Sequence, residues 1–359
     1  MRVLLLAIMI DWLLGDPPNA LHPVAWFGRL AHALESRAPR NNPRAELAYG
    51  AGIAAVGITV AAFPALVLGR VLKSRKAGWI GVVGVAAALK MTFAWRGLIQ
   101  AGESVRCNLQ AGAPERVRAN LQAMVSRDTE SLDPPLLAAA AIESLAENAS
   151  DAFVAPLFYY QLFGLPGAFV YRAVNTLDSM IGYHGRYEFL GKIPARLDDV
   201  LNWIPARLTA LLIVAAARLT GAKPRGAWQA MRRDHARTAS PNAGYPMSAM
   251  AGALDVRLEK VGHYRLNETG RAPRPADIGR AAKIVSVALA LATTLSIWFN
   301  FLPRIARILA NVAVWTLVCS PARSGFCGVP FQARGRDSAK CATSLTTNLD
   351  TTPQSALRR

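Results

Sequence analysis

Long apolar runs alternate with short basic segments through most of the chain. Residues 47–69 and 77–95 are almost uninterrupted apolar runs, and 281–301 is a third, followed by a partial run at 305–318. A run of about 20 apolar residues is long enough to cross the bilayer core as a helix. The pattern therefore predicts an all-α, polytopic integral membrane protein with about four to five membrane helices.

Two other apolar runs are interrupted or short. The run at 152–171 is broken at Gly164-Leu165-Pro166-Gly167, and a straight span there would put Asp151 and Arg172 on opposite sides of the bilayer. We expect a re-entrant helix–break–helix hairpin instead, because broken backbone is tolerated at membrane depth where protein buries it. The run at 208–217 is short and bounded by arginines, which favours a buried or interfacial helix over a span.

Polar segments complete the predicted organisation. Residues 3–14 predict a first helix that two prolines end, and Lys90 is expected to snorkel to the interface. Segments 96–132 and 219–280 are polar and basic, and they predict helical loops. We expect one membrane-embedded domain over 1–318, with its core motifs at 141–260, and a polar, disordered tail at 319–359.

The charge balance fits a membrane protein. The formal net charge is +18, with 52% hydrophobic and only 18% charged residues. Lys and Arg accumulate in the cytoplasmic loops of membrane proteins and also suit anionic substrates. No basic patch is interleaved with aromatics, so we expect no nucleic acid partner. We expect a multi-pass protein of the cell membrane with its active face on the cytoplasmic side.

Charged and amide side chains concentrate in residues 143–207. Asp133-Pro134-Pro135 begins a helix on which Glu143, Glu147 and Asp151 recur every four residues and share one face. Such a stripe is either a solvated helical face or a binding site, and acids beside membrane-like sequence favour the site. The candidate catalytic residues are Glu143, Glu147, Asp151, Asp178, Asp198 and Asp199. The candidate substrate- or nucleotide-binding residues are Arg172, Asn175, Arg196, Asn202, Arg207 and Asn242.

These residue types favour phosphoryl chemistry. Carboxylate and amide oxygens suit Mg²⁺, and guanidinium groups suit phosphate. No P-loop, nucleophile elbow or zinc helix is present. Asn242 lies in a Pro/Asn/Gly segment typical of turns. His22 and His235 are expected to be hydrogen-bonded structural residues, because a lone His is more often structural than catalytic.

Six segments together resemble the cobalamin-biosynthesis family of adenosylcobinamide-phosphate synthases, the CbiB/CobD family of integral membrane proteins. The segments are DWLLGDPPNALHPVAWFGRL at 11–30, AIESLAENASDAFVAPLFYY at 141–160, YRAVNTLDSMIGY at 171–183, ARLDDVLNWIPARLTALL at 195–212, SPNAGYPMSAMAGALDVRLEK at 240–260 and ADIGRAAKI at 276–284. The resemblance covers about residues 1–302, and the chain departs from the family pattern after that point.

The resemblance implies an ATP-dependent amide ligation. The propionate carboxylate of a corrinoid, adenosylcobyric acid, would be joined to the amine of aminopropanol or its phosphate. ATP as co-substrate and Mg²⁺ are implied with it, and Glu147 and Asp151 are the hypothetical Mg²⁺ ligands. The bilayer is an expected partner, and a second copy or other membrane-bound cobalamin enzymes are possible ones. The alternatives are a membrane transporter, which would keep its acids inside spanning helices, and a non-catalytic membrane scaffold.

Overall fold

The structure, a computed structural model, describes residues 1–299 except 41, 73, 75–76, 123, 126–128 and 131. The partial membrane run predicted at 305–318 and the tail predicted at 319–359 lie outside the described residues. Regular structure in the described part is almost entirely helical. Its one sheet is an antiparallel pair, β1 (Leu258–Lys260) with β2 (Tyr264–Leu266). The predicted all-α class is confirmed.

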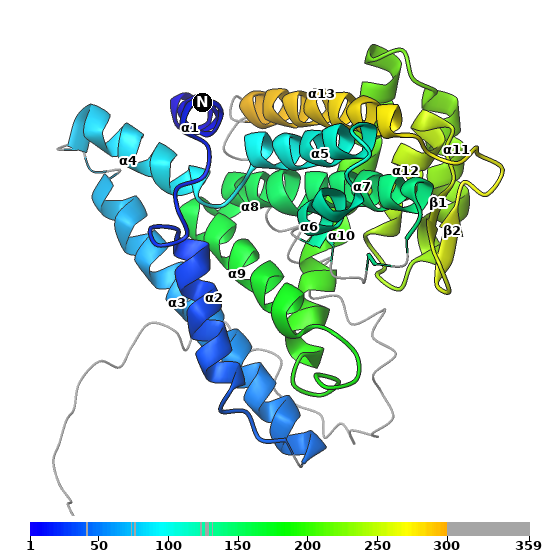
Figure 1. Ribbon diagram of the computed structural model, residues 1–359. Coiled ribbons are helices and arrows are strands. Elements are labelled where there is room, and N and C mark those ends of the chain that lie inside the picture. The colour runs from blue at the N-terminus through cyan, green and yellow to red at the C-terminus, as the bar shows by residue number, and fades with distance from the viewer. Residues whose placement is uncertain are drawn as a thin grey trace, which may run out of the picture. The chain divides into compact units, whose positions relative to one another are not determined.

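Figure 1 labels most of the helices. In chain order they are α1 (Arg2–Leu14), α2 (Pro23–Glu35), α3 (Pro43–Leu72), α4 (Gly78–Lys90), α5 (Trp95–Gln110), α6 (Pro114–Gln122), α7 (Pro134–Ala149), the π-helix η2 (Ser150–Val154), α8 (Ala155–Phe163), α9 (Leu165–Ile181), α10 (Lys192–Leu219), α11 (Pro224–Asp234), the 3₁₀-helix η3 (His235–Arg237), α12 (Gly244–Leu254) and α13 (Pro275–Phe299).

Four helical stretches of the described chain are long and apolar enough to cross a membrane. They are Pro43–Leu72, Gly78–Gln110, Lys192–Leu219 and Pro275–Phe299. The first of them, α3, exposes Val60, Phe63, Val67 and Val71. A row of large apolar side chains without a protein partner suits contact with lipid. The polytopic membrane class is therefore confirmed along with the helical one.

The prediction of a short buried or interfacial helix at 208–217 was wrong. This run is the carboxy-terminal part of α10, which has 28 residues and is itself one of the four candidate spans. α10 packs against α9, α12 and α13. Pro205 lies inside the helix without ending it.

The prediction for Lys90 was also wrong. Its side chain is 0% exposed, and its Nζ lies 2.9 Å from Asp11 Oδ1. It also forms an ion pair with Asp16 and donates to the carbonyl of Phe93 at 3.3 Å. Lys90 stays inside because two carboxylates surround its charge, and a buried ammonium is tolerated only when it is paired.

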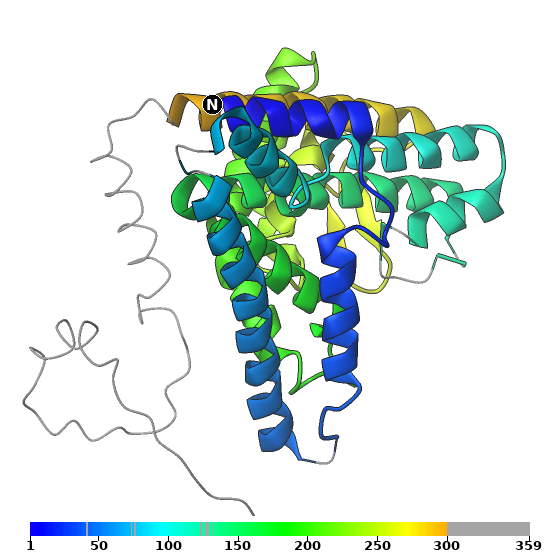
Figure 2. The ribbon, with the colours of Figure 1, turned by 90° about the vertical axis from the view of Figure 1, so that its left-hand side faces the viewer.

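The centre of the fold is the Ala-rich helix α7. Its residues Leu137 to Ala146 are all buried, because small side chains let neighbouring helices approach closely. α5, α12 and α13 pack against it (Figure 1). Figure 2 shows α2 and α3 extending together away from the level of α1 and α13. Since α9 packs on both α2 and α3, it joins this pair to the central helices.

Candidate active site

A hairpin made by α8 and α9 brings distant polar residues together. The chain turns at Gly164, whose φ of 71° is in the region that favours glycine. The two helices then pack closely, since a Cβ on Gly167 would lie 2.4 Å from the carbonyl oxygen of Tyr159. The helix–break–helix arrangement predicted for 152–171 is therefore confirmed, and it returns Arg172 to the neighbourhood of Asp151.

The π-helix η2 carries Asp151 at the start of this hairpin. Its wider turn changes the helical register, and π-turns of this kind are frequent at functional sites. Ala94, in the connection between α4 and α5, donates its backbone N–H to the carbonyl of Ala152 at 3.0 Å. Phe153 packs edge-on against Phe93 and Trp95. These contacts tie η2 to the end of α4, where Lys90 lies.

Asp198 on α10 is the centre of a chain of hydrogen bonds. Its Oδ1 accepts from Asn175 Nδ2 at 3.3 Å, and its Oδ2 accepts from Asn202 Nδ2 at 2.9 Å. Asn202 Oδ1 in turn accepts from the hydroxyl of Tyr171 at 2.9 Å. At the other end, Arg172 Nη1 donates to Asn175 Oδ1 at 3.4 Å. The predicted Arg172, Asn175, Asp198 and Asn202 thus belong to one network between α9 and α10.

Five of the predicted acids are close enough to affect one another; we call Glu147, Asp151, Asp178, Asp198 and Asp199 the carboxylate cluster. Burial raises the pKa of Asp151 well above its usual range, and the charges of Asp198 and Glu147 add to this. Burial, followed by the charges of Asp198, Asp199 and Glu147, raises the pKa of Asp178 to about 7. Arg172 opposes the effect at Asp151. Burial and the neighbouring acids thus both favour the protonated forms of Asp151 and Asp178.

The donor set of the carboxylate cluster fits Mg²⁺ by its chemistry. Among the described residues, no group of three or more His, Cys, Asp or Glu side chains is close enough to hold a metal ion alone. Mg²⁺ usually needs only one or two carboxylates, with water and substrate phosphates completing its shell. The raised pKa values of Asp151 and Asp178 indicate a place where a cation would relieve repulsion.

The remaining predicted residues lie around the cluster. Glu143 is buried, with 4% of its surface exposed, one turn before Glu147. Arg196 is largely exposed and lies 3.6 Å from Asp199. Arg207 is held between the rings of Trp203 and Tyr245, at 4.4 and 4.2 Å from their centroids.

Asn242 connects the loop before α12 to α10. Its Nδ2 donates to the carbonyl of Asp199 at 2.7 Å, and its Oδ1 accepts from Arg207 at 3.3 Å. Both ends of this buried amide are engaged within the protein. The contacts of Asn242 in the structure are those of a residue that positions Asp199.

Tyr171 was not among the predicted residues. It is buried, and its hydroxyl bonds Asn202 at 2.9 Å. The i, i+4, i+7 spacing of Tyr171, Asn175 and Asp178 places all three on one face of α9 and is the signal that sequence reasoning missed.

Both histidines make the structural hydrogen bonds that were expected. His22 Nδ1 accepts from the backbone N–H of Val24 at 3.2 Å and caps α2. His235 Nδ1 lies 3.0 Å from the carbonyl of Met231, and its ring packs on Tyr245.

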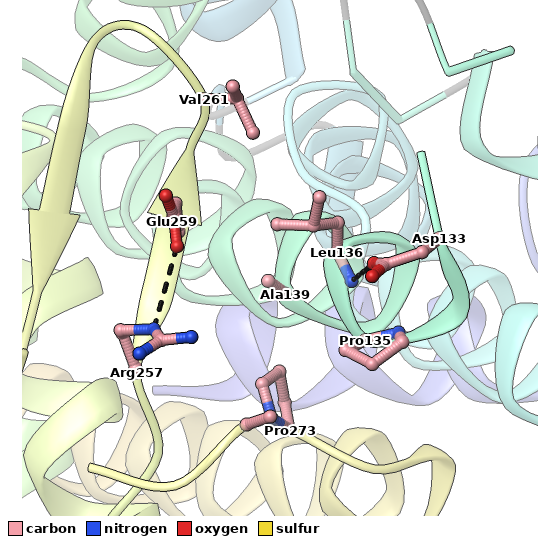
Figure 3. Close-up of a pocket in the computed structure, with 9 residues that line it drawn as sticks. Asp133, Pro135, Leu136, Ala139, Arg257, Glu259, Val261 and Pro273 are labelled. Atoms are coloured by element: carbon pink, nitrogen blue, oxygen red, sulfur yellow. Dashed lines mark hydrogen bonds and ion pairs between the residues drawn. The ribbon is translucent and has the colours of Figure 1, made fainter. Parts of the chain in front are cut away.

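A cleft of about 220 Å³ lies at the amino-terminal end of α7 (Figure 3). In it the Asp133 carboxylate accepts from the N–H of Leu136 at 2.9 Å, which confirms the predicted helix start. Across the cleft, Arg257 lies 3.5 Å from Glu259. None of the predicted site residues lines this cleft. Its volume is below the roughly 300 Å³ of a usual small-molecule pocket, so we place the site at the carboxylate cluster instead.

The fold and the cluster define a polytopic helical membrane protein with a polar, carboxylate-rich site between α7–η2, α9 and α10. The family model of the CobD/Cbib protein matches residues 4–319. The chain therefore belongs to the CobD/CbiB family, and it has a role in cobalamin biosynthesis.

Curated relatives agree with this assignment. A cobalamin biosynthesis protein CobD of Dehalococcoides mccartyi is 43% identical over 306 residues, which cover 85% of this chain and 98% of the relative. Probable cobalamin biosynthesis proteins CobD are 39% identical in Methanothermobacter thermautotrophicus and 43% identical in Pyrococcus abyssi. These matches cover 74% and 79% of this chain and 86% and 91% of the relatives. No solved structure matches the chain.

Proposed function

We propose that this protein catalyses an ATP-dependent amide ligation in cobalamin biosynthesis. The propionate carboxylate of adenosylcobyric acid is joined to the amine of aminopropanol or aminopropanol phosphate, giving adenosylcobinamide or its phosphate. Two things support the proposal: the resemblance of the six segments to adenosylcobinamide-phosphate synthases and the residue types in the carboxylate cluster. The observation that carries most weight is the cluster, because acids that repel one another favour a bound cation such as Mg²⁺, which in turn binds the phosphates of a nucleotide.

The chemistry requires activation of a carboxylate. In the proposed reaction, a carboxylate oxygen of the corrinoid attacks the γ-phosphorus of ATP, and ADP leaves. The acyl phosphate that forms then reacts with the amine, whose nitrogen bonds to the acyl carbon while phosphate departs with the carboxylate oxygen. The nitrogen loses a proton in this step. The site must therefore neutralise phosphate charge and accept one proton.

The described residues suit these two tasks. Asp178 has a pKa of about 7, so near neutral pH its carboxylate accepts a proton and can release it again. We therefore assign to Asp178 the role of accepting the proton that the amine loses. The charge of the Arg172 guanidinium acts on Asp151, and we assign to Arg172 the neutralisation of the phosphate charge. Asp198 and Asn202 join α10 to α9 through Asn175 and Tyr171, which lie on the same face of α9 as Asp178.

Mg²⁺, if it accompanies ATP, would be held by Glu147 and Asp151. It would supply charge neutralisation for the nucleotide phosphates. We further propose that the site opens to the cytoplasmic side of the cell membrane, because ATP is available there. The bilayer then holds the apolar faces of α3 and α13, whose exposed side chains include Phe63 and Trp298.

The first test is product formation in membranes of a host without its own enzyme. The membranes receive adenosylcobyric acid, Mg-ATP and either aminopropanol or aminopropanol phosphate, and mass spectrometry detects the amide. We expect product that depends on ATP and is absent from membranes without the protein. A correctly inserted protein that makes no amide with either amine contradicts the ligase proposal and favours the transporter or scaffold.

The second test uses variants of the cluster. Glu147→Ala and Asp178→Ala should each lower the rate of amide formation by about 10²-fold or more, the usual contribution of a positioned acid–base group. Glu115→Ala is the matched control, since this acid on α6 is 90% exposed and lies outside the cluster. Membrane content of all three variants is measured alongside. Full activity of both cluster variants would contradict the residue assignment.

A further inference from the structure

The amino-terminal half of α10 carries a row of side chains along one helical face. Spaced by three or four residues, they are Arg196, Val200, Trp203 and Arg207. Val200 and Trp203 leave 40% and 39% of their surfaces exposed, and the Arg196 side chain is 68% exposed. A charged side chain inside a bilayer is costly, so a face with an arginine at each end meets water rather than acyl chains.

The guanidinium of Arg207 fixes the indole ring of Trp203. It lies 4.4 Å from the centre of this ring and 4.2 Å from the centre of the Tyr245 ring. Arg207 Nη1 also donates to the backbone carbonyl of Trp203 at 2.6 Å. Because the guanidinium covers one side of the indole, the exposed part of Trp203 is the opposite side and the edge. An aromatic ring that is already held in place binds a planar group with little further loss of side-chain freedom.

Hydrogen bonds join the Trp203 ring to the carboxylate cluster. Arg207 donates to Asn242 Oδ1 at 3.3 Å, and Asn242 Nδ2 donates to the carbonyl of Asp199 at 2.7 Å. Asp199 belongs to the cluster and lies four residues before Trp203, on the same side of α10. At a rise of 1.5 Å per residue, about 6 Å separates their positions along the helix axis. A planar ligand on Trp203 therefore has the cluster within reach of a short side arm.

The chemistry of a corrin ring fits this surface. The ring is a wide, nearly flat macrocycle, so it can cover Val200 together with Trp203, one turn apart on α10. In adenosylcobyric acid the Co(III) ring has a net positive charge, which favours a place over an indole and beside Asp199. A propionate arm is about as long as one helical turn and reaches the cluster. Arg196, 3.6 Å from Asp199 and largely exposed, can pair with the carboxylate of this arm.

We propose that Trp203 is the stacking surface for the corrin ring of the substrate. This inference rests on the proposed function, since it places the corrinoid substrate of that function. The ring lies on Trp203 with the face opposite the adenosyl group, because the adenosyl group covers the other face. Arg207 is a positioning residue that holds the indole, and Asn242 connects it to Asp199.

The test compares three substitutions. Trp203→Ala removes the stacking surface, and Trp203→Phe keeps an aromatic ring. Trp228→Ala is the matched control, since Trp228 is 43% exposed on α11 and lies outside the row on α10. Calorimetry on the purified full-length protein measures affinities for adenosylcobyric acid and for Mg-ATP without turnover. Melting temperatures are recorded for every variant, and the amide assay gives kcat and the KM of the corrinoid.

We expect Trp203→Ala to bind adenosylcobyric acid about 10- to 100-fold more weakly, the range for an aromatic residue that dominates a contact, and to bind Mg-ATP like the unchanged protein. The KM of the corrinoid should rise by a similar factor at nearly constant kcat, because stacking is the same in the bound state and in the transition state. Trp203→Phe should keep most of the affinity, and Trp228→Ala all of it. A purely structural role would instead lower the melting temperature and both affinities together.

Unchanged affinity for adenosylcobyric acid in folded Trp203→Ala overturns the inference, and Trp203 is then an interfacial aromatic residue. A loss of affinity for Mg-ATP alone overturns it as well, because the indole would then hold the nucleotide base. An unchanged protein that does not bind the corrinoid has the same consequence. If Trp203→Ala fails to fold, Trp203→Leu replaces it, since leucine keeps apolar bulk without a π face.

The proposed ligase function is tested separately by the same protein. If the unchanged protein binds adenosylcobyric acid but makes no amide, the ligase proposal fails. The difference in corrinoid affinity between Trp203→Ala and Trp228→Ala then still decides the role of Trp203.

Discussion

Two groups of buried charges in this protein differ in how they are balanced. At the end of α4, Lys90 is completely buried between Asp11 and Asp16. Between α7–η2, α9 and α10, the five acids of the carboxylate cluster share Arg172 and the largely exposed Arg196. In the first group a lysine lies between two acids, and in the second the acids raise one another's pKa. Both occur in a chain with only 18% charged residues.

The difference separates structural from functional charge. An ion cluster that is paired internally holds its elements in place and needs no ligand. A cluster whose acids raise one another's pKa stays incomplete until protons or ligands neutralise it. The Lys90 group therefore positions the loop that carries Asp16, and the carboxylate cluster is where the proposed function places the charge of the substrate.

The largest effect should come from removing the structural cation. Lys90→Met leaves Asp11 buried without its partner, and breaking a buried pair in this way costs about 3–5 kcal/mol. Thermal unfolding of the detergent-solubilised protein measures the loss, and Asp11→Asn combined with Lys90→Met should recover part of it. Arg172→Met is the comparison in the other group. Its loss should be smaller, because Asp151, with its raised pKa, takes up a proton. If Lys90→Met and Arg172→Met lose the same stability, the proposed difference between the two groups of charges is contradicted.

A smaller effect is expected for the pH dependence of stability at Asp178. Burial and the neighbouring acids raise its pKa to about 7 in the folded protein, well above that of an ordinary aspartate. The folded state therefore holds a proton that the unfolded state has lost, and stability falls as pH rises from about 4 to about 7. Asp178→Asn removes this penalty.

Relative to the unchanged protein, we expect this variant to gain about 2–3 kcal/mol of stability between pH 5 and pH 8, because the pKa of Asp178 lies about two units above pH 5 and each unit is worth about 1.4 kcal/mol. This gain corresponds to roughly 5–10 °C in melting temperature. Melting curves at both pH values test this. If the difference in melting temperature between Asp178→Asn and the unchanged protein is the same at pH 5 and pH 8, the raised pKa of Asp178 is contradicted. The same variant should be inactive in the amide assay.

The smallest effect is expected at the edge of the cluster. Tyr171→Phe removes the hydroxyl that bonds Asn202 Oδ1 and leaves the ring in place. The loss of one neutral hydrogen bond should cost about 1 kcal/mol of stability. Amide formation should fall less than in Asp178→Ala, because Asn202 keeps its bond to Asp198. A loss as large as that of Asp178→Ala would show that Tyr171 itself acts on the substrate.

The local sequence was enough to predict several helices and part of the candidate site. Apolar length predicted the spans at α3 and α13, Asp133 with its prolines predicted the start of α7, and Gly164 predicted the break between α8 and α9. The four-residue spacing of Glu147 and Asp151 and the resemblance of the segments located the acids. The family of the protein and its role in cobalamin biosynthesis also follow from the sequence.

The tertiary structure alone decided which charges are neutralised and by what. Lys90 was expected at the interface, because its position near the end of an apolar run does not reveal that Asp11 and Asp16, more than 70 residues earlier, surround it. Likewise, a role for Tyr171 was recognisable only from its hydrogen bond to Asn202. Periodicity and caps are local and can be read along the chain. Pairing of buried charges depends on distances in space between distant segments, so it is determined only by the folded protein.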